Sequence, residues 1–139
     1  IAIDHLAELQ SKYDLRSRNI FYAHLAQSIS ETVRSFDDVY YLGKGEFIVV
    51  LKHVDFIDAG GAMDRLRHHI RSTFATLKNG EQVNLTASFG VAEALPKESS
   101  ELLLQHAKDA LQQARRAGGN CICEFREMSA FDTFVKEHP

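Results

Sequence analysis

An arginine and an aspartate lie three residues apart at the start of the segment RSFDDVYYLGKGEFIVVL, residues 34–51. The guanidinium group of Arg34 could donate a forked pair of hydrogen bonds to a phosphate or to the edge of a base, and could stack on that base. The carboxylate of Asp37 could accept hydrogen bonds from N–H groups. The same spacing also allows an ordinary local ion pair at the end of a helix. Residues 34–37 are therefore a candidate binding motif with a structural alternative.

The turn that follows, Gly43-Lys44-Gly45, is short and cationic. It separates two runs, DVYYL and EFIVVL, that are rich in β-branched and aromatic residues. Because glycine adopts positive φ readily, this pattern predicts a β-hairpin. Asp37 would lie at the base of the hairpin and Lys44 at its tip.

The rest of the pattern predicts a single α+β domain. We expect a strand at 1–4, helices over about 20–35, from Asp55 onward and from Ser99 or Ser100 to Gly118-Gly119, and strands over QVNLTASFGVAEA (82–94) and NCICEF (120–125). The helix from Asp55 would present on one face Ala62, Leu66, Ile70, Phe74 and Leu77. A central, mainly antiparallel sheet flanked by helices satisfies this order, as in folds related to the ferredoxin-like and nucleotide-cyclase palm folds.

Composition sets further bounds. A chain of 139 residues, 45% hydrophobic and 25% charged, is long enough for one globular domain and too short for two. The net charge of −3 argues against a duplex nucleic-acid binder, and neither a membrane-spanning run nor a signal peptide is visible. Cys121 and Cys123 are predicted to be reduced thiols on a strand, which favours a cytoplasmic setting. The seven scattered histidines are interpreted as surface residues rather than metal ligands.

Four stretches, in order along the chain, resemble the GGDEF domain family of diguanylate cyclases. IAIDHL (1–6) is similar to the family's first strand, DIDHF, and GKGEF (43–47) stands where GGDEF or GGEEF belongs. LTASFGVAEA (85–94) is similar to VTVSIGVA, and LLLQHAKDALQQARRAGGN (102–120) is similar to LLxxADxALYxAKxxGRN. The resemblance spans nearly the whole chain. Any one of these matches alone would be weak.

The resemblance also implies that the catalytic site is degenerate. The family's enzymes condense two GTP molecules into cyclic di-GMP, and carboxylates hold Mg²⁺ against the triphosphate. Those carboxylates correspond to Ala2 and Gly45, which have none, and Lys44 would project into the space that the phosphates need. We therefore expect no catalytic residue, metal or other cofactor in a degenerate active site made up of Ala2, Ala7, Gln10, Asn19, Gly43, Lys44, Gly45 and Glu46.

A second family site is preserved in its spacing. Many members bind their product at an inhibitory R-x-x-D motif that ends five residues before the signature, and Arg34 and Asp37 occupy that register. A second arginine from the following helix often completes the site, and Arg65 lies at the corresponding distance along the chain. Arginine donors suit guanine O6 and N7, and a carboxylate suits guanine N1–H and the exocyclic amine. The alternative is that Arg65 is one more solvated helix arginine.

The leading hypothesis is therefore a catalytically inactive GGDEF-like domain over residues 1–126, whose N-terminal start is missing, followed by a helix or linker at 127–139. It would act as a cyclic di-GMP receptor that signals to a protein partner or to an adjacent regulatory or phosphodiesterase domain. A ligand-free interaction module, a homodimer for instance, is the main alternative. An active cyclase and an inactive GTP-binding variant are two more.

Overall fold

A five-stranded sheet forms the centre of the molecule. The computed structural model describes residues 1–125 of the 139-residue chain. In chain order its elements are β1 (Ala2–Ile3), α1 (Leu6–Lys12), α2 (Leu15–Thr32), β2 (Asp38–Gly43), β3 (Glu46–Val50), α3 (Phe56–Ser72), β4 (Phe74–Thr76), β5 (Gln82–Asn84), β6 (Ala87–Val91), α4 (Ser100–Arg116) and β7 (Ile122–Glu124). The central sheet has the order β2-β3-β1-β6-β7, and β4 and β5 form a small sheet of their own.

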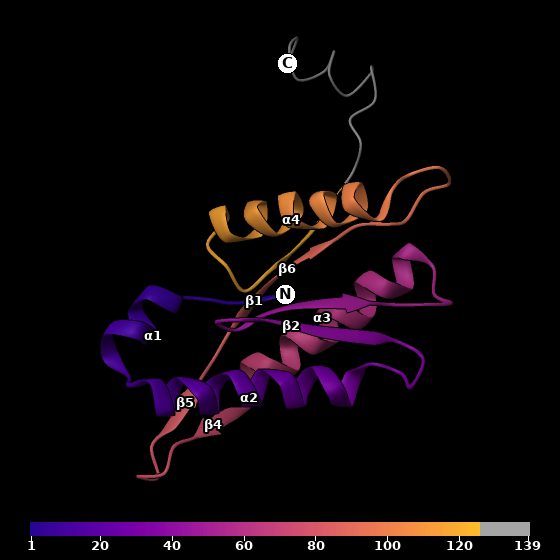
Figure 1. Cartoon of the computed structure of the whole chain (residues 1–139). Helices are drawn as coiled ribbons and strands as arrows, with labels where there is room; N and C mark the ends of the chain where they lie inside the picture. Colours follow the sequence, from indigo (N-terminus) through magenta and orange to yellow (C-terminus); the bar gives the residue numbers. More distant parts are fainter. Residues whose placement is uncertain (126–139) are drawn as a thin grey trace.

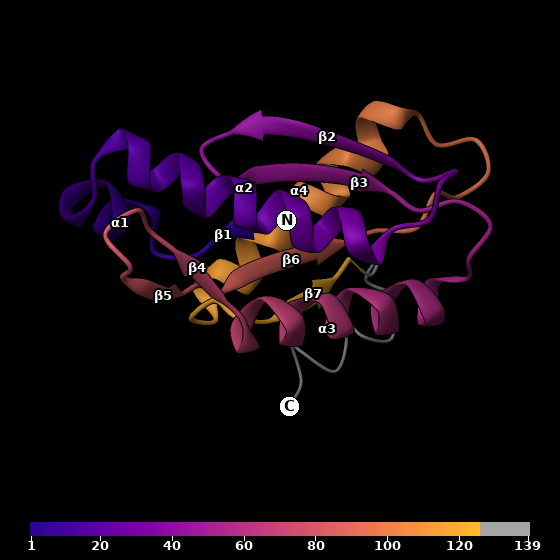
Figure 2. The same cartoon turned by 90° about the horizontal axis from the view of Figure 1, so that it is seen from below.

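The pairing confirms the predicted α+β class with a mainly antiparallel sheet. β1 lies between β3 and β6 and is antiparallel to both, β2 is antiparallel to β3, and only β7 runs parallel to its neighbour, β6. In Figure 1, α4 lies above the sheet, whereas α2 and α3 lie below it and pack against each other. Figure 2 shows the same layers from below, with β2 at one edge.

The helix starts follow from local capping. The side-chain oxygens of Asp14, Asp55 and Ser99 accept hydrogen bonds from backbone N–H groups in the first turns of α2, α3 and α4. Such a cap satisfies one of the donors that have no partner inside a helix, and is worth about 1 kcal/mol. The cap at Asp55 was predicted, and for α4 the prediction was a cap at Ser99 or Ser100. The cap at Asp14 was not, so α2 begins five residues before the predicted start near residue 20, and α1 was missed altogether.

Two further predicted boundaries are wrong. The helix from Asp55 ends at Ser72, so that Phe74 lies in β4 and Leu77 follows it, because residues 74–76 pair with residues 82–84 instead of continuing the helix. That pairing also divides the predicted strand 82–94 into β5, in the small sheet, and β6, in the central one. The predicted helix or linker at 127–139 lies outside the described residues.

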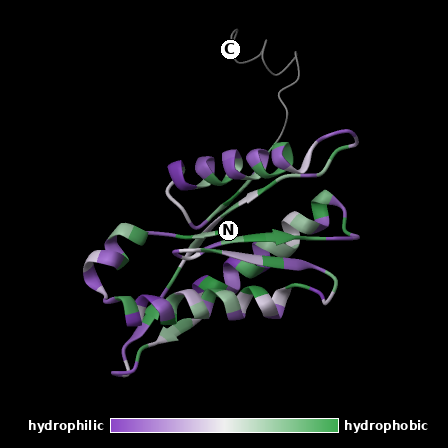
Figure 3. Ribbon diagram, viewed as in Figure 1, coloured by the Kyte–Doolittle hydropathy of each residue, from purple (hydrophilic) through white to green (hydrophobic). Residues whose placement is uncertain are grey.

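The core lies mainly between the sheet and the layer formed by α2 and α3. Its largest fully buried side chains include Phe21, Leu25, Ile70 and Phe89. Burial of each contributes about 1.5–3 kcal/mol. In Figure 3, β3 is hydrophobic along most of its length, and the outward side of α4 is hydrophilic. A Cβ atom on Gly90 would overlap main-chain atoms of α4, so glycine here allows α4 to pack directly on β6.

The cysteines and histidines differ in how well they were predicted. Both cysteines are free thiols, as predicted, and burial raises the pKa of Cys121, whose thiol donates to the carbonyl oxygen of Ala114. Two histidines are not the surface residues that we expected, because His24 is half-buried and the side chain of His106 is only 16% exposed.

In residues 1–125, no helix is long and apolar enough to cross a membrane.

Candidate functional site

The hairpin turn joins β2 to β3 with three consecutive residues of positive φ. Gly43, Lys44 and Gly45 have φ values of 92°, 52° and 74°. Glycine adopts these angles without penalty, whereas lysine does so at some cost. The side chain of Lys44 is exposed at the tip, as the sequence predicted, and Gly45 is buried.

The hairpin lies directly against β1, which brings together several of the positions that were expected to form a degenerate active site. Ala2 is paired with Glu46 across the two strands, and the Ile3 backbone N–H donates to the Gly45 carbonyl at 2.9 Å. A Cβ atom built on Gly45 would lie 2.5 Å from Cγ2 of Ile3, so this backbone conformation leaves no room for a side chain there. The Gly45 N–H donates to the hydroxyl of Tyr41 at 3.2 Å.

Side-chain oxygen donors are few among these positions. Mg²⁺ and Ca²⁺ are held by several oxygen ligands, usually including carboxylates. Ala2 and Gly45 carry no side-chain oxygen, which leaves the half-buried Glu46 as the single carboxylate of this group. Ala7 and Gln10 lie exposed on α1, and Asn19 lies exposed on α2. Within residues 1–125, no hydrogen bond joins any of these three to the hairpin.

The turn from Arg34 to Asp37 is built around the Asp37 carboxylate. One oxygen accepts from the Arg34 backbone N–H and the other from the Lys52 backbone N–H, each at 2.9 Å. Desolvation tends to raise the pKa of Asp37, but these two donors, with the charges of Arg34 and Lys52, hold it below its ordinary value. The carboxylate is therefore charged at neutral pH and fixed between the end of α2 and the end of β3.

The side chain of Arg34 does not pair with Asp37. Its guanidinium carbon lies 5.3 Å from the centre of the Phe36 ring, and that ring packs edge-on against His53 at 5.4 Å. Arg34 and Phe36 are both exposed. In the described part of the chain, Arg34 has no ion pair, so the simple ion-pair interpretation of this motif is not what the structure contains.

Arg65 is exposed on α3, the helix that packs beside α2. Its Nη1 atom lies near Gly61, one turn earlier on the same helix. Among the described residues, no ion pair or hydrogen bond links Arg65 to Arg34 or Asp37. The structure therefore unites Arg34 and Asp37 in one turn and leaves Arg65 on the adjacent helix.

Sequence reasoning missed three residues around this turn. Phe36 lies inside the R-x-x-D motif and supports Arg34, His53 supports Phe36, and Lys52 holds Asp37. Phe36 could have been found, because an aromatic residue beside an arginine is a recognisable cation–π signal. Lys52 and His53 are brought to the turn by the pairing of Asp38 with Val50, which the sequence does not specify.

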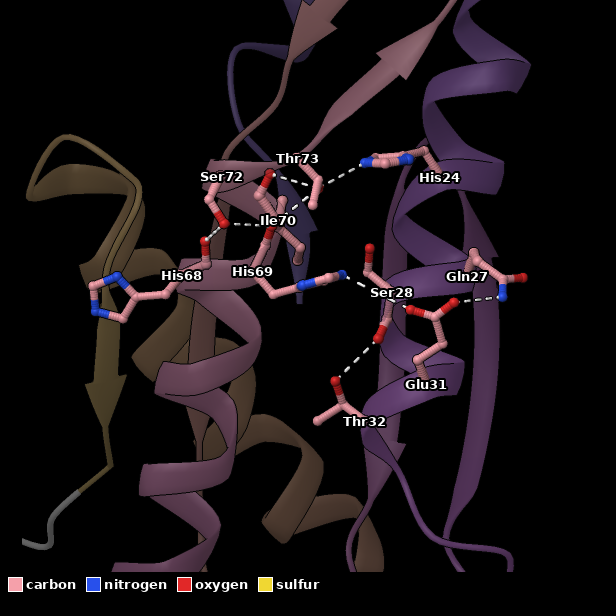
Figure 4. A network of polar contacts seen from close by, with 10 residues as sticks. All are labelled: His24, Gln27, Ser28, Glu31, Thr32, His68, His69, Ile70, Ser72 and Thr73. Atoms are coloured by element: carbon pink, nitrogen blue, oxygen red, sulfur yellow. Dashed lines mark hydrogen bonds and ion pairs between the residues drawn. The ribbon is translucent and has the colours of Figure 1, made fainter.

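A polar network connects α2 with α3, the helix that carries Arg65 (Figure 4). A ring nitrogen of His24 on α2 lies 3.1 Å from the hydroxyl of Thr73, and His69 on α3 lies 3.8 Å from the carboxylate of Glu31. Burial lowers the pKa of His24, the nearby His69 lowers it further, and Glu31 opposes the shift. The contact between α2 and α3 therefore contains a histidine that favours its neutral form.

Comparison with known proteins identifies the family. A model of the family described as "Diguanylate cyclase, GGDEF domain" matches residues 1–121. The chain belongs to the GGDEF domain family. Among curated relatives, this domain is 29% identical over 122 residues to the diguanylate cyclase DosC of Escherichia coli, covering 88% of the chain and 26% of DosC. It is 31% identical over 99 residues to the response regulator PleD of Caulobacter vibrioides, covering 70% of the chain and 22% of PleD.

The fold agrees with this assignment. The GGDEF domain of DgcB from Caulobacter crescentus, solved in complex with c-di-GMP, superimposes with a TM-score of 0.85 at 20% identity, over 91% of this chain and 75% of that one. At this identity the superposition supports the fold alone. The chain spans about a quarter of the length of the curated relatives DosC and PleD.

Proposed function

We propose that this GGDEF domain has lost cyclase activity and acts in the cytoplasm as a receptor for cyclic di-GMP, which binds at Arg34, Asp37 and Arg65. One observation carries the proposal: within residues 1–125 the exposed Arg34 guanidinium makes no ion pair, and it lies in the same turn as a carboxylate that is already fixed by backbone donors. An arginine whose charge is not engaged in an ion pair is available to a guanine base or a phosphate. The solved complex of the DgcB domain with c-di-GMP makes this ligand class the natural candidate.

The side chains available as metal ligands support the loss of catalysis. Phosphoryl transfer from GTP depends on metal ions that neutralise the developing charge. At the two positions where the family resemblance places carboxylates, Ala2 and Gly45 offer no oxygen, and Ile3 fills the space beside Gly45. We therefore expect this domain to have no cyclase activity.

Isothermal titration with cyclic di-GMP tests the receptor function. We expect micromolar or tighter binding that Arg34→Ala abolishes, because the forked donor and its stacking face are both lost. Arg34→Lys keeps the charge without the fork and is expected to weaken binding by about tenfold or more. Asp37→Asn, which keeps an oxygen acceptor for the turn, is also expected to weaken binding.

Arg65→Ala tests the arginine on α3, and Arg71→Ala is its control, since both residues are exposed on that helix. We expect Arg65→Ala to weaken binding and Arg71→Ala to leave it unchanged. Absence of heat with the wild-type domain would contradict the proposal and favour the ligand-free interaction module. Equal effects of the two substitutions would remove Arg65 from the site.

Incubation with GTP and Mg²⁺, followed by chromatography, tests the loss of catalysis. We expect no cyclic di-GMP above a protein-free blank, because the carboxylates for the metal are missing. A known active GGDEF cyclase under the same conditions is the positive control. Product formed by this domain would overturn our interpretation of Ala2 and Gly45.

A further inference from the structure

Phe36 is an exposed aromatic residue inside the turn that carries Arg34 and Asp37. Its surface is 42% exposed. The turn around it is closed twice, because the Asp37 N–H donates to the Arg34 carbonyl at 3.0 Å and the Asp37 carboxylate accepts from the Arg34 N–H at 2.9 Å. A single exposed apolar side chain is ordinary on a protein surface. The groups that surround Phe36 are what set it apart.

Phe36 contacts two other planar side chains. The guanidinium carbon of Arg34 lies over its ring, 5.3 Å from the centre, within the distance at which a cation and an aromatic face attract each other. The imidazole of His53 meets the same ring edge to face, with the centres 5.4 Å apart and the planes at 72°. All three residues are exposed. We call these three side chains the stacking platform.

The backbone on both sides of the stacking platform is fixed by Asp37. One carboxylate oxygen holds the backbone of Arg34, and the other accepts from the Lys52 N–H at 2.9 Å, directly before His53. The side chain of Lys52 is itself paired with Asp38 at 2.9 Å. His53 has a φ of 55°, a conformation that persists in a residue other than glycine only where surrounding contacts hold it. The stacking platform is therefore assembled before a ligand arrives, which lowers the entropy cost of binding.

Arg65 lies near the same end of α2. The contacts drawn in Figure 4 show that α2 and α3 run in opposite directions, with a link between His69 and Glu31 at 3.8 Å. Arg65 precedes His69 by four residues and therefore shares its face of α3. Arg34 follows Glu31 by three residues, so both arginines lie about one helical turn beyond that link. A ligand bound on the stacking platform is thus within reach of the Arg65 side chain.

We propose that one guanine of the bound cyclic di-GMP stacks on the stacking platform, with Phe36 as the ring that receives it and Arg65 in contact with a phosphate. This inference rests on the proposed receptor function and adds a residue that reads the base. A phosphate needs only cationic and N–H donors. A purine has a flat π surface, and exposed aromatic and guanidinium groups stack on such surfaces in nucleic-acid-binding proteins. The combination of Phe36 with Arg34 therefore favours a base over a phosphate at this end of the site.

Isothermal titration with cyclic di-GMP tests the role of Phe36. Phe36→Leu keeps an apolar side chain but removes the aromatic face, and we expect it to weaken binding by about tenfold. Phe36→Tyr keeps the face and is expected to stay within about twofold of the wild type. Circular dichroism of each variant shows whether it is folded.

Phe74→Leu is the matched control, because Phe74 is also exposed, at 50%, and lies far from the turn. It follows Thr73, which contacts His24. His24 lies ten residues before Arg34 along the chain, about 15 Å at the rise of an α-helix. We expect Phe74→Leu to bind cyclic di-GMP as the wild type does.

Fluorescence gives a readout that a purely structural role of Phe36 would not change. The chain contains no tryptophan, so Phe36→Trp introduces a single indole at the stacking platform. We expect saturating cyclic di-GMP to quench its emission, because a stacked guanine is in direct contact with the indole. Inorganic phosphate, which has no base, is expected to leave the emission unchanged, as is cyclic di-GMP added to the control Phe74→Trp.

Three results would overturn the inference and leave the receptor function standing. The first is wild-type affinity in Phe36→Leu. The second is binding heat in Phe36→Trp without quenching, or with equal quenching in Phe74→Trp. The third is weaker binding in Phe36→Leu that Phe36→Tyr does not restore, because it would show that Phe36 acts through packing alone. Absence of binding by the wild-type domain would overturn both the inference and the receptor function.

Discussion

At the scale of single residues, one buried carboxylate ties the two ends of the described chain together. Asp4 accepts hydrogen bonds from the hydroxyl groups of Thr86 and Ser88 and from the backbone N–H of Asn120. It is 7% exposed. Because each oxygen is engaged, the carboxylate is satisfied without a cation, and it fixes β1 to β6 and to the loop before β7.

The close approach of Asp4 predicts the effect of a substitution at Gly119. A Cβ atom there would lie 2.8 Å from Cγ of Asp4, and the φ of +80° adds backbone strain. We expect Gly119→Ala to lower the free energy of unfolding by at least about 2 kcal/mol in chemical denaturation.

Gly118→Ala is the matched control. Gly118 has a φ of +110° but has no atom within 4 Å of a built Cβ, so this variant reports the backbone strain alone. We expect it to cost about 1–2 kcal/mol. Equal losses for the two variants would mean that contact with Asp4 is not what requires glycine at position 119.

The sequence predicted the local motif but not the hydrogen-bond partners of its residues, and the reason is physical. The spacing of Arg34 and Asp37 is a local property, so the sequence was enough to predict that they belong to one motif. The acceptor role of Asp37 toward Lys52, and that of Asp4 toward Asn120, depend on segments that meet only in the folded chain. No pattern in a single sequence specifies those partners.

At the scale of elements, the contact between α2 and α3 is expected to weaken in acid. Burial holds the pKa of His24 below its ordinary value of 6.5 in the folded protein. As the pH falls through 6.5, the unfolded chain takes up this proton first, so the stabilisation present at higher pH is lost progressively through the folded-state pKa. The nearby carboxylate of Glu31 acts on the pKa of His24 in the opposite direction.

The measurement is the free energy of unfolding at about pH 7.5 and about pH 5.5, for the wild-type domain and for His24→Gln. Glutamine can still bond to Thr73 but does not titrate. We expect the loss between the two pH values to be smaller in the variant. His53→Gln serves as a comparison, because that histidine is exposed and lies outside this helix contact. A loss that is the same in the wild type and in His24→Gln would exclude His24 as the group responsible.

Elements were predicted from sequence where local signals decided them. Hairpin 38–50 and helix α4 were right because turn glycines and the cap at Ser99 are local. The start of α2 was missed because polar residues follow Asp14 and hide the apolar period. The end of α3 was missed because Phe74 and Leu77 continue the helical period, and tertiary pairing between β4 and β5 overrides it.

At the scale of the whole molecule, composition and element order were enough to predict the α+β class and a mainly antiparallel sheet. They did not specify the strand order or the parallel pairing of β7 with β6. Which strand is exposed at the edge depends on that order. For this reason the sequence predicted only an ordinary hairpin strand for the run 39–42, and the structure shows that this strand lies at the edge of the sheet.

The central position of β1 in the sheet affects how the domain folds during its synthesis. β1 is flanked by β3 and β6, and Asp4 beside it bonds to Asn120, 116 residues further along the chain. Contacts of this range form slowly, because a large loop must close before they stabilise anything. During synthesis, β1 must therefore wait until β6, at residues 87–91, has emerged before it acquires both neighbours, and Asp4 must wait for Asn120. In that interval the apolar strand β1 has an unpaired edge that β6 later covers, so translation is a stage at which this domain is exposed to aggregation.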